Sequence, residues 1–216
     1  MNDDRACARC GKTAPLCVCA GITPIATKLK LLILQHPQEQ DVDLGTARLA
    51  ALHFESAEVR VGLSWPSLGK ALGLKPGQSA DPKRWAALYL GSAQVTKFPP
   101  GRTVVALNKK GEPALDQEEA LKNLQGVIVL DGTWAQAKTL WWRNPWLLKT
   151  RRIALKPARP SRYGNLRREA RREALSTLEA TALLLSALEN NQGIADSLHA
   201  SFERLLAAYR THIRSR

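Results

Sequence analysis

Residues 126–142, GVIVLDGTWAQAKTLWW, decide the expected fold. Residues 127–130 form an apolar run, rich in β-branched side chains, of the length typical of a buried parallel strand. The run ends at the turn dipeptide Asp131-Gly132, and helix-forming residues follow Thr133, a good N-cap residue. This succession places Asp131, Thr133 and Trp134 at the carboxyl end of a strand, where open α/β sheets bind ligands. Taken alone, the segment also fits a plain helix cap with Trp134 packed on the sheet.

The remainder of the chain alternates strand and helix patterns. Strands are expected at 28–34, 57–62, 85–90, 103–107 and 152–156, and helices at 44–52 after an Asp41 or Asp43 cap, 67–72, 116–124, 174–189 and 196–214. The alternation predicts an α/β domain with a mostly parallel sheet. We expect three parts: a cysteine-containing segment at 1–21, a main domain at 22–190, and a C-terminal helix at 191–216 packed on that domain.

All four cysteines lie close to the N-terminus in the pattern C-x2-C-x6-C-x-C, at Cys7, Cys10, Cys17 and Cys19. Two short knuckles that bring four thiolates together are typical of a tetrahedral structural zinc site. Disulfides suit an oxidising compartment, and the N-terminus lacks the basic and apolar regions of a signal peptide. A redox role for Cys7 and Cys10 is the other alternative. The favoured interpretation is a small zinc knuckle that depends on its metal for folding.

The chain is strongly basic, with a formal net charge of +13 and a pI near 10. Residues 149–172 contain ten Lys and Arg residues against a single acid, Glu169, with Tyr163 among them. This composition predicts a polyanionic partner and favours RNA, whose unpaired bases stack on aromatic and guanidinium planes. A merely solvated charged loop is the alternative. No apolar run reaches the ~18 residues that a membrane span needs, and we expect a cytoplasmic protein.

Four separated pieces of the sequence resemble one family when they are taken together. They are the cysteine cluster, the QHPQE run at 35–39, the DGTW run at 131–134, and the stretch from Tyr163 to the STLEA run at 176–180. In this order they resemble the DTW-domain proteins of the bacterial tRNA-uridine aminocarboxypropyltransferase group, over residues 7 to 189. The resemblance implies kinship with SPOUT methyltransferases, which have an α/β fold with a C-terminal trefoil knot that binds S-adenosylmethionine. It also implies transfer of the 3-amino-3-carboxypropyl group of S-adenosylmethionine to N3 of a tRNA uridine, with release of methylthioadenosine.

The resemblance also implies roles for particular residues. Asp131 either acts as general base toward uracil N3 or orients the base, because a nearby helix N-terminus weakens a carboxylate as a base. The expected catalytic group is Asp131, Thr133, Trp134, His36 and Glu39; the expected S-adenosylmethionine contacts are Gly132, Ser176, Thr177, Glu179 and Ser92; the expected RNA contacts are Tyr163, Arg162, Arg167, Arg168 and Arg171. The start of the helix at Ser176 would offer backbone N–H groups to the methionine carboxylate.

Two other functions fit the same residues. An S-adenosylmethionine-dependent RNA methyltransferase on this fold would differ only in which carbon of the sulfonium faces the nucleophile. A zinc-knuckle RNA-binding protein without enzymatic activity would give no product and would tolerate loss of Asp131. The oligomeric state, monomer or homodimer, stays open.

Overall fold

A six-stranded sheet forms the centre of the computed structural model, which describes residues 6–88, 98–166 and 175–214. The strand order is β2-β1-β5-β3-β6-β4, and every neighbouring pair is parallel except β4 and β6. The strands are β1 (Lys30–Gln35), β2 (Ala57–Val61), β3 (Trp85–Leu88), β4 (Val104–Leu107), β5 (Gly126–Asp131) and β6 (Arg151–Leu155). The predicted mostly parallel α/β sheet is confirmed.

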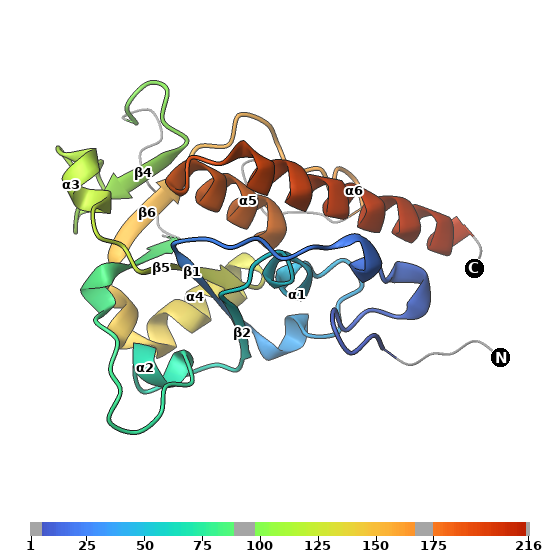
Figure 1. Cartoon of the computed structure of the whole chain (residues 1–216), viewed down its shortest axis with the longest axis horizontal. Helices are drawn as coiled ribbons and strands as arrows, with labels where there is room; N and C mark the ends of the chain where they lie inside the picture. The colour runs from blue at the N-terminus through green and yellow to red at the C-terminus, as the bar shows by residue number, and fades with distance from the viewer. Residues whose placement is uncertain (1–5, 89–97, 167–174, 215–216) are drawn as a thin grey trace.

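Helices cover both faces of the sheet and produce three layers (Figure 1). The helices are α1 (Ala47–Ala51), α2 (Leu68–Ala71), α3 (Gln117–Leu121), α4 (Trp134–Arg143), α5 (Thr177–Leu188) and α6 (Gln192–Arg214). The core on one face contains α1, α5 and α6, and the core on the other face contains α2, α4 and the 3-10 segment Pro145–Lys149. In Figure 1, α5 and α6 lie side by side above the sheet, whereas α2 and α4 lie below it.

The central strand β5 is buried on both faces, which explains its continuous apolar sequence. All six of its residues are buried. Val127 and Val129 pack toward α5, whereas Ile128 and Leu130 pack toward α4. Alternate residues of one strand therefore fill two separate cores, and only the polar Asp131 ends the run.

The carboxyl ends of β1 and β5 lie at a topological switch point. After β1 the chain passes through α1 to β2, on one side of β1. After β5 it passes through α4 to β6, in the opposite direction and across the opposite face. Because adjacent strands with diverging connections leave a crevice at their carboxyl ends, this edge is where an open α/β sheet binds a ligand.

Several helix boundaries differ from those predicted. The helix predicted after Asp41 or Asp43 begins instead at Ala47, after Thr46, so the predicted cap is wrong. Its start is delayed because Pro37–Glu39 forms a 3-10 turn and the Gly45 N–H closes a further turn on the Val42 carbonyl. The helix capped by Asp116 ends early, at Leu121, ahead of Asn123, whose positive φ of 57° is incompatible with a continuing helix.

The N-terminal segment packs on the main domain, because Leu16 lies in the same core as α5 and α6. The three-part division of the chain stays a prediction. The C-terminal trefoil knot also stays a prediction, because a knot depends on the whole chain path and residues 89–97 and 167–174 lie outside the described residues. Within the described ranges, no helix combines the length and the apolar character that crossing a bilayer requires.

Gly126 is expected to be irreplaceable at the start of β5. A Cβ atom there would lie 2.5 Å from the Trp85 ring and 2.6 Å from the Lys30 carbonyl oxygen, neither of which can rotate away. We expect Gly126→Ala to lower the free energy of unfolding by about 3 kcal/mol, as overpacking does. Urea unfolding measures this, with Gly69→Ala as control because its Cβ would lie 3.7 Å from the nearest atom. Equal stability of the two variants would contradict the prediction.

Candidate functional site

Asp131 occupies the switch point, where two distant parts of the chain hold its side chain. It is 5% exposed, and its backbone pairs in register with Gln35 of β1. The Gln35 amide donates from Nε2 to Asp131 Oδ2 at 2.8 Å, and the Thr177 hydroxyl at the start of α5 donates to Oδ1. Because a buried carboxylate requires donors to compensate lost hydration, these bonds fix both the position and the orientation of the acid.

His36 lies next to Asp131 on the same sheet edge. Its backbone N–H donates to the Asp131 carbonyl oxygen at 2.9 Å. Its ring Nδ1 accepts from the Gln38 N–H at 3.3 Å, which assigns the imidazole proton to Nε2 as a donor. A Cβ atom on Gly132 would meet Gln136 Cβ at 2.8 Å and His36 Cβ at 3.4 Å. Glycine at 132 therefore allows the two strand ends and α4 to approach each other closely.

Thr133 and Trp134 open helix α4. Thr133 is exposed and forms a capping box with Gln136: its backbone N–H donates to Gln136 Oε1 at 2.6 Å, and its hydroxyl accepts from the Gln136 N–H. The Gln136 amide donates to Gln38 Oε1 at 3.0 Å and so joins α4 to the turn after β1. Trp134 is half-buried. The acid, hydroxyl and indole are thus at a partly open edge of the sheet, and the hydroxyl has a capping role.

Ser176 and Glu179 form the second capping box, at the start of α5. The Glu179 carboxylate is buried and accepts from the Ser161 hydroxyl at 2.6 Å, from the Arg162 N–H at 2.8 Å, and from the Ser176 hydroxyl at 2.8 Å and its N–H at 3.0 Å. All four of these partners are donors. Glu179 therefore attaches the basic loop at 161–163 to α5, a structural role beside the expected ligand contact.

Tyr163 is a core residue. Its side chain is 2% exposed, its hydroxyl donates to the Leu44 carbonyl oxygen at 2.6 Å, and its ring meets Phe202 edge to face with centroids 5.0 Å apart. The expectation that Tyr163 stacks on RNA is corrected here, because this position does not present the ring to a base. The neighbouring Arg162 is exposed and pairs with Glu203 of α6, and its contact with RNA stays a prediction.

The start of α5 offers fewer N–H groups than the sequence suggests. The Leu178 N–H donates to Thr46 Oγ1 at 3.2 Å, and the Glu179 N–H donates to Ser176 Oγ at 3.1 Å. Within the described residues, the Thr177 N–H has no such acceptor. An anion approaching this helix would thus meet one backbone donor together with the helix dipole.

The remaining predicted residues divide into two groups. Glu39 lies in the 3-10 turn after His36 and is buried at 5% exposure. Ser92, Arg167, Arg168 and Arg171 lie outside the described residues.

The four cysteines converge as the sequence predicts. The sulfur atoms of Cys7, Cys10, Cys17 and Cys19 all lie within 4.8 Å of one another, with Cys10 and Cys17 3.8 Å apart, and all four are free thiols. A tetrahedral ion with ~2.3 Å metal–sulfur bonds places sulfur atoms about 3.8 Å apart, so the cluster fits such a metal after a small contraction. Gly11, with φ of +72°, allows the tight turn that follows the first pair.

The environment of the sulfur atoms is uneven. The backbone N–H groups of Cys10 and then Arg9 donate to the Cys7 sulfur and lower the pKa of its thiol to about 6. Burial raises the pKa of both Cys10 and Cys19 above the usual range of a thiol. A bound cation would stabilise the buried thiolates that desolvation disfavours.

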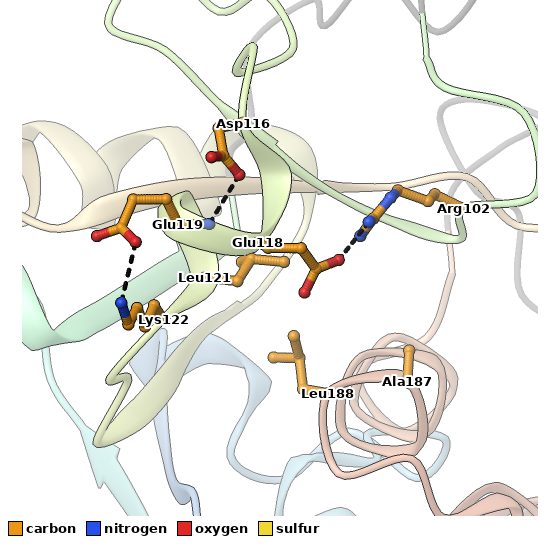
Figure 2. Close-up of a pocket in the computed structure, with 8 residues that line it drawn as sticks. All are labelled: Arg102, Asp116, Glu118, Glu119, Leu121, Lys122, Ala187 and Leu188. Atoms are coloured by element: carbon orange, nitrogen blue, oxygen red, sulfur yellow. Dashed lines mark hydrogen bonds and ion pairs between the residues drawn. The ribbon is translucent and has the colours of Figure 1, made fainter.

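A cavity of about 580 Å³ lies between α3 and the end of α5, away from the cysteine cluster (Figure 2). Its charged side chains pair with each other: Arg102 contacts Glu118, and Lys122 contacts Glu119 at 3.3 Å. Leu188 lines it from the last turn of α5, eleven residues or ~16 Å along the helix from Thr177. This cavity is therefore separate from the Asp131 edge.

Two residues of the network were not predicted as site residues. Gln35 belongs to the QHPQE run but had no predicted role of its own, although a polar side chain at the end of a buried strand is a recognisable signal of a functional residue. Its Oε1 is buried without a partner in the described part of the chain. The Thr46 side chain does not cap its own helix. Its hydroxyl oxygen accepts instead from the Leu178 N–H of α5, a contact that no local sequence pattern indicates.

The fold and the site define an α/β protein with a polar edge at a topological switch point and a separate four-cysteine cluster able to bind a metal. Comparison with known families identifies it further. The family model described as DTW domain matches residues 4–210, and the chain belongs to this family.

Curated relatives are similar over nearly the whole chain. Proteins named tRNA-uridine aminocarboxypropyltransferase 2 from Macaca fascicularis and Mus musculus are each 26% identical over 214 residues, 95% of this chain. The chain spans 64% of the length of these two relatives. The Drosophila melanogaster protein of the same name is 27% identical over 201 residues, which are 91% of this chain and 72% of that relative. No solved structure matches.

Glu179→Gln is expected to destabilise the protein, because the new amide would point N–H groups at donors that now surround an acceptor. Leaving buried donors unsatisfied costs about 2–3 kcal/mol in the free energy of unfolding. Urea unfolding measures the change, and Glu118→Gln on exposed α3 is the matched control, since exposed ion pairs contribute little. A Glu179→Gln variant as stable as the control would show that the hydrogen bonds of Glu179 do not hold the loop at 161–163.

Proposed function

We propose that this chain transfers the 3-amino-3-carboxypropyl group of S-adenosylmethionine to N3 of a tRNA uridine. The observation that carries the proposal is the buried Asp131 carboxylate, held by Gln35 and Thr177 at the switch point of a DTW-family chain. The names of the curated relatives and the net charge of +13, which suits a polyanionic substrate, support it.

The proposed reaction is a displacement at carbon. Uracil N3 carries a proton and is a weak nucleophile until that proton leaves, and Asp131 takes the proton as general base. The N3 electron pair then forms a bond to the terminal carbon of the aminocarboxypropyl chain, and the C–S bond breaks. Its electron pair stays on sulfur and converts the sulfonium into the neutral thioether of methylthioadenosine. Since the leaving group is already good, alignment supplies most of the acceleration.

The residues around Asp131 have supporting roles in this proposal. Gln35 and Thr177 hold the carboxylate in one orientation at the switch point, so little reorganisation precedes proton transfer. The His36 Nε2–H donates to a uracil carbonyl oxygen and stabilises the negative charge that develops when N3 loses its proton. Trp134 packs beside the base or the donor at the same edge. The Thr177 N–H and the dipole of α5 attract the methionine carboxylate.

Asp131→Asn is expected to abolish most of the activity while preserving the fold. The amide has the shape of the acid but cannot accept a proton, and general-base catalysis contributes about 10²–10⁴ in rate. We expect kcat to fall at least 100-fold, with dissociation constants for S-adenosylmethionine and tRNA near those of the wild type. The measurement is methylthioadenosine release, and S-adenosylhomocysteine as the product would indicate methyl transfer instead.

Asp116→Asn is the matched control, because Asp116 caps α3 at the far end of the sheet (Figure 2). This variant should retain wild-type kcat. An Asp131→Asn variant that turns over like Asp116→Asn would remove Asp131 from the chemistry. Loss of both binding affinities in Asp131→Asn would give it a structural role.

We also propose that the four cysteines bind one structural Zn²⁺. The support is a sulfur-only tetrad of tetrahedral size in a segment whose apolar residues Leu16 and Val18 pack on the core of the main domain. Zinc would supply most of the folding energy of residues 7–19, and no step of the transfer passes through it.

Purified protein is expected to contain one zinc per chain, measured by elemental analysis. Cys10→Ser and Cys17→Ser should each lose the metal and lower the thermal midpoint by several degrees, because binding free energy is lost from the folded state. Thr13→Ala changes the same loop without removing a thiolate and should keep the zinc. Four thiols that react with a thiol reagent at equal rates in native, metal-free protein would contradict this assignment.

A further inference from the structure

The outward face of helix α4 carries an exposed tryptophan among basic side chains. Ala137, Leu140 and Trp141 face the core, so the opposite face is turned to solvent. Trp142 lies on that outward face with 69% of its surface exposed. Large apolar groups are normally turned inward on a helix with a buried side, so an indole on the polar side next to basic side chains offers an aromatic surface to a partner.

Trp142 belongs to a row of side chains that begins at the Asp131 edge. Trp134, Lys138 and Trp142 are four residues apart, and such residues lie one above the other along one side of a helix. Trp134 follows the candidate site directly, and Trp142 lies eight residues or ~12 Å further along the axis. Lys138, between them, is exposed.

The stretch of sequence that contains this row carries only positively charged side chains. Residues 132–168 contain ten Lys and Arg residues and no acid. Lys138, Arg143 and Lys149 are exposed and form no ion pair with any residue in the described ranges. By contrast, Arg162 is paired with Glu203 and Arg152 lies 6.0 Å from the buried Trp141 ring. Cations without carboxylate partners beside an exposed indole suit phosphates and an unpaired base.

We propose, on the basis of the proposed function, that the α4 row of Trp134, Lys138 and Trp142 is a tRNA-binding track on which Trp142 stacks an unpaired base near the modified uridine. N3 lies on the Watson–Crick edge of uracil, so the target uridine must be unpaired when it reacts, and its neighbours in a loop are available for stacking. At ~3.4 Å per stacked nucleotide, the 12 Å along α4 corresponds to about three or four nucleotides. Lys138 lies where it meets a phosphate between them.

A second copy of this chain fits the face less well than RNA does. Each copy carries a net charge of +13, and two such faces would bring Lys138, Arg143 and Lys149 against their own counterparts. Like charges placed opposite each other oppose association, whereas a polyanion releases counterions on binding.

Trp142→Ala is expected to weaken tRNA binding about tenfold, which is within the range for loss of one base–aromatic stack. KM for tRNA should rise by a similar factor while kcat and the S-adenosylmethionine dissociation constant change little. Trp142→Phe retains a ring and should recover most of the affinity. Leu115→Ala is the control, since Leu115 is fully exposed in the segment before α3 and should bind tRNA like the wild type.

The salt dependence separates the two kinds of contact. Lys138→Ala should reduce the slope of log affinity against log salt by about one, because one phosphate contact is lost. Trp142→Ala should lower the affinity at every salt concentration with the slope unchanged. Intrinsic fluorescence, quenched by tRNA in the wild type, should be quenched less in Trp142→Ala.

Three outcomes would overturn the proposal. Wild-type tRNA affinity in Trp142→Ala, with active enzyme, would remove the indole from the interface and leave the proposed function intact. A dimer of the wild type that Trp142→Ala dissociates, measured by analytical ultracentrifugation, would assign this face to a second copy. An equal loss of affinity in Leu115→Ala would mean that the effect is unspecific. If the wild type binds tRNA through Trp142 but makes no methylthioadenosine, the track stands and the proposed function fails.

Discussion

The buried carboxylate of Asp131 is the constraint on which the arrangement of the site depends. A charged group at 5% exposure is stable only with donors around it, and those donors come from the neighbouring strand through Gln35 and from the C-terminal helix pair through Thr177. The bonds join three elements that are far apart in the chain, at separations of 96 and 46 residues. The same contacts that compensate the charge therefore fix α5 to the carboxyl edge of the sheet, at the switch point between β1 and β5.

Local features of this fold could be predicted from the sequence, because each has a local physical cause. The strand at 126–131 is apolar since both of its faces are buried, Thr133 and Ser176 are recognisable caps, and the cysteine spacing indicates its cluster. The predicted start of α1 was wrong because two consecutive turns, at 37–39 and at 42–45, come before the helix. The Gln35–Asp131–Thr177 network has no local signature, since it depends on which strands are neighbours. The family resemblance located the motifs that contain these three residues, but it did not indicate which of their atoms form hydrogen bonds.

Some motif residues support the site from within rather than face the proposed ligand. Glu179 belongs to the STLEA run, yet its oxygens accept from Ser161, Arg162 and Ser176, and Tyr163 lies in the core against Phe202. A family signature marks positions that the site requires without separating these two roles. Burial alone does not separate them, because Asp131 and Glu179 are each 5% exposed and each accepts from donors of its own chain. Their places in the fold differ: Asp131 ends β5 at the topological switch point, whereas Glu179 joins the loop at 161–163 to the start of α5.

Positive charge alone cannot select one uridine among many, because phosphates are the same at every position of an RNA. Exposed cations on α4 and an indole on the same face would hold single-stranded RNA with little regard for sequence. Under the proposed function, selection arises at the switch point, where Asp131 would accept from the base and the His36 Nε2–H would donate to it. Uracil presents the complementary pattern, an N3–H between two carbonyl oxygens, whereas cytosine N3 has no proton to give. In this proposal the sheet edge discriminates between bases, and the basic helix face would increase the residence time of the RNA.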